Sequence, residues 1–151
     1  MKNILVINGP NLNLLGEREP DIYGSTGLAE LEERISERAK QLGVTVECFQ
    51  SNSEGAIIDK LQNSAAKCSG IIINPGGLTH YSVSLRDCLL TVACSVIEVH
   101  ISNIYAREEF RAKSVLADIV LGQISGLGLD GYLFALERLS QCSPHSKSHE
   151  K

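Results

Sequence analysis

Residues 4–10 read ILVINGP, a short and fully apolar run that turn-forming residues end. Continuous apolar runs of this kind are typical of strands buried on both faces of a parallel sheet. GIIIN at residues 70–74 repeats the pattern and is the clearest buried strand in the chain. These two runs predict a parallel sheet covered by helices on both faces.

Strand-like and helix-like segments alternate along the rest of the chain. Three further strands are expected, at residues 44–50, 95–100 and 119–125. Helices are expected between them: one capped by Ser25 or Thr26 and ended by Gly43, one after the cap candidates Ser51, Asn52 and Ser53, one over about 83–92, a short turn at 107–111, and one from about 127 to 141. This order predicts an α/β fold, a doubly wound five-stranded parallel sheet of flavodoxin-like type.

The length of 151 residues fits one domain, because domains commonly hold about 100 to 200 residues. We expect this single domain to cover residues 1–141. The closing residues 142–151, CSPHSKSHEK, are polar and aperiodic, so we expect them to form a disordered tail.

Charge and cysteine usage exclude several classes of protein. The 14 Lys and Arg against 18 Asp and Glu give a net charge of −4, which lacks the basic footprint of a nucleic-acid binder. The five cysteines form no C-x-x-C pair, which favours a reducing compartment over a disulfide framework. No apolar run approaches the 18 or so residues of a membrane span. We therefore expect a cytoplasmic protein with neither nucleic acid nor membrane as a partner.

Polar side chains concentrate where the expected strands end. Ligands of open parallel sheets bind at this carboxyl edge. The loop at 8–24 is long for a strand-to-helix connection, and such loops are commonly functional. Polar residues at the edge are Asn8, Asn11, Arg18, Tyr23, Gln50, Ser51, Asn52, Glu54, Asn74, His80, Glu98, His100, Ser102 and Asn103. They indicate acid–base and hydrogen-bonding chemistry.

Motifs for cofactors and metals are missing. Neither G-x-G-x-x-G nor the P-loop pattern follows the first strand, and neither H-x-H nor H-E-x-x-H occurs. No lysine stands at the carboxyl end of a strand, which argues against a Schiff base. We expect catalysis without a metal, a cofactor or a covalent intermediate.

Five colinear strings resemble the type II 3-dehydroquinate dehydratases, and the likeness covers residues 3–139. They are NGPNLNLLGEREPDIYG (8–24), QSNSEGAIID (50–59), NPGGLTHYSVSLRD (74–87), EVHISNIYAREEFR (98–111) and GLGLDGYLFAL (126–136). The resemblance implies dehydration of 3-dehydroquinate to 3-dehydroshikimate in the shikimate route to aromatic compounds. It also implies a flavodoxin-like fold and a homo-oligomer, a dodecamer of four trimers.

The resemblance also implies roles for individual residues. Tyr23 matches the base, and Arg18 matches the cation that stabilises its anion. Lowering a phenol pKa from about 10 by two or three units requires about 3 to 4 kcal/mol, which suits a guanidinium in a water-excluded pocket. A loop tyrosine packed on the surface is the alternative for Tyr23.

His100 matches the general acid. Glu98 lies two residues before it on the same strand face, where it can orient the imidazole. A purely structural Glu–His pair is the alternative. Asn11 matches a residue that holds a water or the enolate oxygen, with a turn asparagine as its alternative.

The substrate-binding set implied by the resemblance is Asn74, His80, Ile101, Ser102 and Arg111. Asp87 matches a residue that reaches the site of a neighbouring subunit. Arg86 and Arg107 are expected instead to be structural ion-pair partners. Residues 13–24, which carry Arg18 and Tyr23, are expected to act as a lid.

Two other functions stay open at this point. A serine hydrolase would use Ser82 or Ser102 with His80 or His100 and Asp87, although G-x-S-x-G is absent. A non-catalytic flavodoxin-like module that binds a small polar metabolite would need only the polar strand ends.

Overall fold

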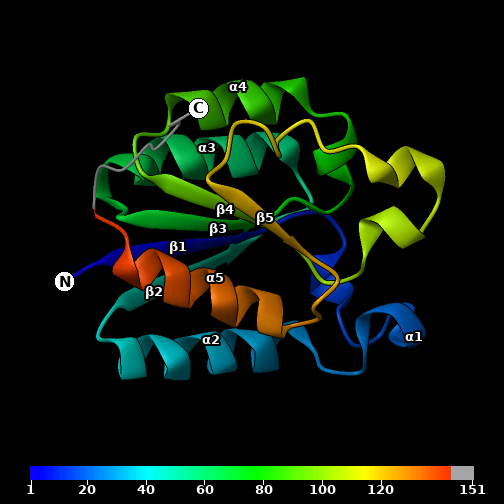
Figure 1. Cartoon of the computed structure of the whole chain (residues 1–151), viewed down its shortest axis with the longest axis horizontal. Coiled ribbons are helices and arrows are strands. Elements are labelled where there is room, and N and C mark those ends of the chain that lie inside the picture. Colours follow the sequence, from blue (N-terminus) through cyan, green and yellow to red (C-terminus); the bar gives the residue numbers. More distant parts are fainter. Residues whose placement is uncertain (144–151) are drawn as a thin grey trace.

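The computed structural model describes residues 1–143, apart from the side chain of Tyr23. Five parallel strands form one sheet in the order β2-β1-β3-β4-β5 (Figure 1). Their bounds are β1 (Asn3–Asn8), β2 (Thr45–Gln50), β3 (Gly70–Asn74), β4 (Ser95–His100) and β5 (Gly122–Ser125). The order changes direction between β1 and β3, so the doubly wound, flavodoxin-like sheet expected from the sequence is confirmed.

Helices cover both faces of the sheet (Figure 1). On one side lie α2 (Leu28–Leu42) and α5 (Asp130–Gln141), and on the other lie α3 (Glu54–Ser64) and α4 (Val83–Thr91). The short α1 (Pro20–Tyr23) lies in the loop after β1. Short 3-10 turns complete the loops: η1 (Leu12–Leu14), η2 (Ala65–Lys67), η3 (Gly76–His80), η4 (Ile104–Ala106) and η5 (Glu109–Ala112). Within residues 1–143, no helix combines the length and apolar content needed to cross a membrane.

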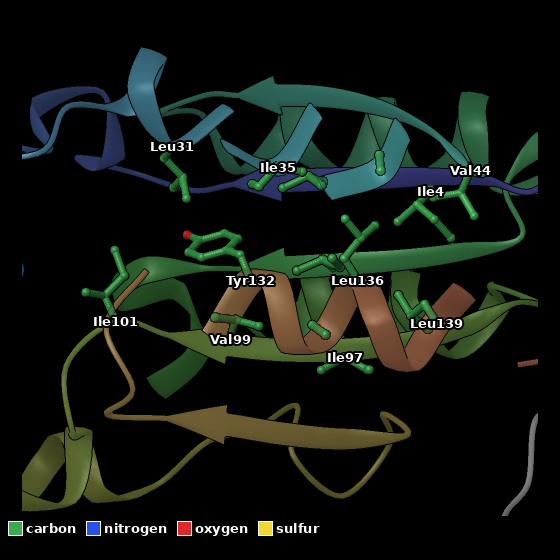
Figure 2. Packing of buried hydrophobic residues seen from close by; sticks show 14 of the residues in the cluster. Ile4, Leu31, Ile35, Val44, Ile97, Val99, Ile101, Tyr132, Leu136 and Leu139 are labelled. Carbon is green, nitrogen blue, oxygen red and sulfur yellow. The ribbon is translucent and has the colours of Figure 1, made fainter. Parts of the chain in front are cut away.

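Two hydrophobic cores explain why the strands are apolar without interruption. Ile4 and Val6 of β1 face the core beneath α2 and α5, which Figure 2 shows around Tyr132 and Leu136. Leu5 and Ile7 of the same strand face the core beneath α3 and α4. Because successive strand side chains point to opposite faces, a strand between two helical layers needs apolar residues at every position.

Several element starts differ from the sequence-based predictions, the smaller shifts being β2, which begins at Thr45, and the turn expected at 107–111, which is η5 and begins at Glu109. Helix α2 has Gly27 as its N-cap, so the predicted Ser25 or Thr26 cap is wrong. The backbone of Ser25–Gly27 passes close to Gly16. A Cβ added at Gly16 would lie 2.8 Å from Ser25 O. Strand β5 begins at Gly122, because Ile119 donates its N–H to Leu116 O in a turn.

Helix α5 begins at Asp130 and not near residue 127. Gly126 and Gly128 take φ values of 88° and 62°, left-handed conformations that cannot continue a right-handed helix. The other predicted caps are confirmed: Ser53 Oγ accepts from Ala56 N at the start of α3, and left-handed Gly43 ends α2.

The end of the domain also departs from expectation. Cys142 was placed in the disordered tail, but it is buried in the core beneath α2 and α5. Its N–H donates to Leu139 O and prolongs the packing of α5 by one residue. Residues 144–151, the rest of the predicted tail, lie outside the described residues.

Gly9 lets the loops after β1 and β3 approach each other, so Gly9→Ala is expected to destabilise the protein. A Cβ at Gly9 would lie 2.5 Å from Pro75 O, a backbone atom that side-chain rotation cannot move. We expect a loss of about 2 kcal/mol in the free energy of unfolding, measured by denaturant titration. Gly55→Ala is the matched control, since its Cβ would meet only Ser53 Oγ at 3.9 Å. Equal stabilities for the two variants would contradict the close approach.

Candidate active site

A pocket of about 850 Å³, counting its open mouth, lies at the carboxyl edge of the sheet. Loops after β1, β3 and β4 supply its walls. Eight of the predicted site residues line it: Asn11, Arg18, Asn74, His80, His100, Ile101, Ser102 and Arg111. Two predicted site residues, Glu98 and Asp87, are not in this lining, and the side chain of Tyr23 lies outside what the structure describes.

The structure places the side chains of both Glu98 and Asp87, but only the backbone of Tyr23. Glu98 is fully buried behind His100. Asp87 is exposed on α4. Tyr23 ends α1, five residues after Arg18, and its side chain lies outside what the structure describes.

The described lining is cationic. It includes the three guanidinium groups of Arg18, Arg107 and Arg111, and it contains no Asp or Glu among the described residues. Arg111 is held by Glu108 at 2.5 Å, while Glu19 lies 3.7 Å from Arg18 and 3.8 Å from Arg107. Planar guanidinium groups bind carboxylates with two parallel hydrogen bonds. The pocket is therefore suited to an anionic ligand, although the chain as a whole is acidic.

Arg107 corrects an expectation. It was expected only as a structural ion-pair partner, and it does pair with Glu19, but it also lines the pocket and donates to Ser102 Oγ at 3.4 Å. Arg86, in contrast, pairs with Asp118 as expected and is not part of the lining. The sequence signal for Arg107 was its place in the loop after β4, five residues after Ser102.

Glu98 and His100 form a buried pair on β4. Glu98 Oε2 lies 2.5 Å from His100 Nε2, and both side chains are almost completely buried. Strand periodicity places the two side chains on one face, so this expected contact is confirmed. His100 also lines the pocket, whereas Glu98 does not. The imidazole of His100 therefore faces the pocket, and the carboxylate of Glu98 orients this imidazole from the side away from the pocket.

Three further side chains surround the Glu98 carboxylate. Thr79 Oγ1 and Gln123 Nε2 donate to Oε2 at 2.9 and 2.7 Å, and Ser114 Oγ donates to Oε1 at 2.8 Å. Sequence reasoning missed all three residues. Only Gln123 carried a signal, since it pairs in register with Glu98 on the neighbouring strand β5. Thr79 and Ser114 come from loops whose approach depends on the tertiary fold.

This arrangement stabilises the ionised form of Glu98. Burial alone would raise the pKa of this carboxyl group, but the hydrogen bond and charge of His100, with the hydrogen bonds from Ser114 and Gln123, outweigh burial. The pKa of Glu98 is therefore lowered from its usual value. A carboxylate that stays ionised keeps a proton on the Nε2 that it faces.

Glu98→Gln is expected to destabilise the protein by about 3 kcal/mol at neutral pH, because four donors would then surround an uncharged amide. Since the folded-state pKa of Glu98 is below the unfolded value of about 4.3, its contribution is complete above that value and is lost as the pH falls through the folded pKa. Denaturant titrations between pH 7 and pH 3 should show a shallower acid-side loss for Glu98→Gln than for the wild type. Exposed Glu33→Gln should run parallel to the wild type. An unchanged slope in Glu98→Gln would contradict this account.

His80 and Asn11 are also fixed by backbone geometry. His80 Nδ1 lies 2.8 Å from Lys113 O, and because a carbonyl oxygen only accepts, Nδ1 carries the proton. Asn11 takes a left-handed φ of 71°, and its N–H donates to Asn52 Oδ1 at 2.9 Å. Both residues line the pocket, and these hydrogen bonds hold the His80 ring and the Asn11 backbone in place.

The geometry opposes the serine hydrolase alternative. Ser82 Oγ donates to Glu54 at 2.6 Å and caps α4 by accepting from Leu85 N, and it does not line the pocket. Ser102 Oγ accepts from Arg107. Among the hydrogen bonds described for residues 1–143, neither serine contacts a histidine, so the nucleophile–base pair of such an enzyme is not formed. The described residues also contain no group of three His, Cys, Asp or Glu side chains placed to hold a metal ion.

Comparisons with known proteins agree with one another. A protein named 3-dehydroquinate dehydratase from Endomicrobium trichonymphae is 60% identical, with 92% of this chain and 97% of that protein covered. The crystal structure of a type II dehydroquinase from Butyrivibrio crossotus gives a TM-score of 0.90 at 52% identity, with coverage of 91% and 97%.

A type II dehydroquinase from Propionibacterium acnes gives a TM-score of 0.92 at 45% identity, with 94% of this chain and 98% of that chain covered. The profile of the class II dehydroquinases matches residues 2–140, which is nearly all of the described chain. With its sheet order, its cationic pocket and the buried carboxylate–imidazole pair behind that pocket, this chain belongs to the dehydroquinase class II family.

Proposed function

We propose that this protein is a 3-dehydroquinate dehydratase, a lyase that converts 3-dehydroquinate to 3-dehydroshikimate in the shikimate route to aromatic amino acids. The observation that supports it most is the buried Glu98–His100 pair at the wall of an arginine-lined pocket. An anionic substrate suits the arginines, and a leaving hydroxide needs the proton of an acid. Two relatives, at 60% and 55% identity, carry this activity in their names.

The proposed reaction is an elimination that needs neither a metal nor a cofactor. Tyr23, as the phenolate, takes a proton from the carbon next to the ketone, and the electron pair of that C–H bond forms an enolate. Arg18, which lines the pocket, stabilises the phenolate. The enolate then reforms the ketone as the neighbouring C–O bond breaks, and His100, acting as the imidazolium, gives the departing hydroxide its Nδ1 proton, because its Nε2 proton is held by Glu98. The products are the conjugated enone and water.

The other lining residues are proposed to bind and orient the substrate. Arg111, with Arg107 added from the structure, supplies charge for the substrate carboxylate or hydroxyl oxygens. Asn74, His80, Ile101 and Ser102 supply hydrogen-bonding groups, and Asn11 holds a water or the enolate oxygen. The segment at 13–24 is proposed to close over the bound substrate, because it carries both Arg18 and Tyr23.

We further propose that the working form is a homo-dodecamer of four trimers in the cytoplasm. Asp87 is exposed, which suits its expected reach into a neighbouring site, and Tyr81, Val83 and Leu90 near it are exposed apolar side chains. No disulfide is formed within residues 1–143, which suits a reducing compartment. Light scattering should give a mass near twelve times the 16.4 kDa of one chain. A monomer with full activity would contradict the role of Asp87.

The activity is tested by adding 3-dehydroquinate to the purified, assembled protein and following the ultraviolet absorbance of the conjugated enone. Catalytic turnover is expected, with many moles of enone formed per mole of protein. A metabolite-binding module would give binding heat in calorimetry without any enone. That outcome would contradict the proposed activity and support the module.

A further inference from the structure

Tyr132 is fully buried and does not line the substrate pocket, but its hydroxyl group is hydrogen-bonded to Asn74, which does. It comes from the first turn of α5 and packs in the core beneath α2 and α5. Figure 2 shows its ring among the apolar side chains, with its oxygen directed away from Leu136 and Leu139. A phenylalanine would fill the same space, so packing alone does not explain the hydroxyl group.

The hydroxyl group of Tyr132 joins two asparagines that end neighbouring strands. Tyr132 OH donates to Asn8 Oδ1 at 2.6 Å and accepts from Asn74 Nδ2 at 2.8 Å. Burial raises the pKa of Tyr132, which keeps the hydroxyl protonated and able to donate. The order Asn74 to Tyr132 to Asn8 therefore has a fixed direction.

This direction determines how Asn74 meets a ligand. Asn74 Oδ1 accepts from Gly76 N at 3.1 Å, and one proton of Nδ2 goes to Tyr132. Within residues 1–143, the second proton of Asn74 Nδ2 has no acceptor, and Asn74 lines the pocket. The amide is thus held with a donor available for a ligand oxygen.

The arrangement leaves one buried group unsatisfied. Asn8 Nδ2 is the one buried side-chain nitrogen or oxygen in the described chain that has no hydrogen-bond partner. Turning the Asn8 amide over would place a second donor against Tyr132 OH and would leave the hydroxyl proton of Tyr132 without an acceptor. An unpaired buried donor lowers stability, and such exceptions are rare in folded proteins. The fold retains it in the orientation that fixes Tyr132.

We propose that Tyr132 is a positioning residue for substrate binding: with Asn8 behind it, it orients the Asn74 amide as a donor toward an oxygen of the anionic substrate. Tyr132 does not touch the substrate and acts only through Asn74. This inference rests on the proposed function for its kinetic readout, because substrate affinity is measured with 3-dehydroquinate.

A double-mutant cycle on the full-length, assembled protein tests the proposal. Tyr132→Phe should lower kcat/KM about tenfold, mainly by raising KM, and Asn74→Ala should lower it about a hundredfold. If Tyr132 acts through Asn74, adding Tyr132→Phe to Asn74→Ala should cost less than a further twofold. A further tenfold loss in the double variant would show an independent, structural effect and would overturn the proposal.

Two more variants distinguish a loss of substrate positioning from a general loss of stability. Asn8→Ala keeps the tyrosine and should lower kcat/KM about threefold, again only when Asn74 is present. Ser82→Ala removes another buried hydroxyl, the α4 cap, and should lower the melting temperature while leaving kcat/KM within twofold. An equal KM increase in Ser82→Ala would mean that Tyr132→Phe acts through stability.

A readout without substrate separates this proposal from the proposed function. In nitrogen-15 NMR, the side-chain amide protons of Asn74 should exchange with solvent at least tenfold faster in Tyr132→Phe than in the wild type. Unchanged exchange would overturn the positioning role even if the enzyme is active. Faster exchange in Tyr132→Phe, combined with a wild type that does not turn over 3-dehydroquinate, would support the positioning role and contradict the proposed function.

Discussion

Tyr23→Phe is expected to lower kcat for 3-dehydroquinate about a thousandfold with KM changed less than threefold. The phenol oxygen is the proposed base, and a general base in place contributes about a hundredfold to ten-thousandfold to a rate. Phenylalanine keeps the aromatic ring and removes only the oxygen, so ground-state binding should survive. Steady-state assays of enone formation measure both constants.

The matched control for this variant is Tyr81→Phe, since Tyr81 is exposed and does not line the pocket. It removes a tyrosine oxygen from the same chain and should keep kcat within twofold. A Tyr23→Phe variant that retains more than a tenth of the wild-type kcat would remove Tyr23 from the mechanism. The elimination would then need another base at the pocket.

His100→Asn is expected to have the second largest effect, a fall of about a hundredfold or more in kcat. Without an acid, the leaving group departs as free hydroxide, and the barrier rises by about 3 kcal/mol for a hundredfold loss. KM should change little, because the transferred proton matters only in the transition state. The measurement is the same steady-state assay over a range of pH.

His80→Asn provides the comparison, because both histidines line the pocket but only His100 is paired with a buried carboxylate. We expect His80→Asn to raise KM more than it lowers kcat. If the two variants gave the same pattern, the assignment of His100 as the acid would lose its support.

The layout of the fold could be predicted because local patterns specify it. Uninterrupted apolar runs identified β1 and β3, and alternation along β4 placed Glu98 and His100 on one face. Glycine often ends a helix because it adopts the left-handed conformation, and serine often begins one because its hydroxyl group caps the first turn. The roles of Gly43 and Ser53 could therefore be predicted from residue type alone.

What could not be predicted depends on contacts between distant segments. The Ser25 cap failed because the backbone there is constrained by Gly16, nine residues earlier. The donors around Glu98 come from η3, β5 and the loop at residue 114, and no periodic pattern relates them. The prediction for Arg107 covered only its structural ion pair, because the sequence does not show that one side chain can both pair with Glu19 and line the pocket.

The central claim is that the residues of this chain alone dehydrate 3-dehydroquinate. The most direct test is proton NMR of 3-dehydroquinate incubated with catalytic amounts of the assembled protein after treatment with EDTA. We expect the vinyl proton signal of 3-dehydroshikimate to grow at the same rate as with the untreated wild type. In His100→Asn this signal should not grow. An unchanged 3-dehydroquinate spectrum, or activity that returns only when a metal ion is added, would contradict the central claim.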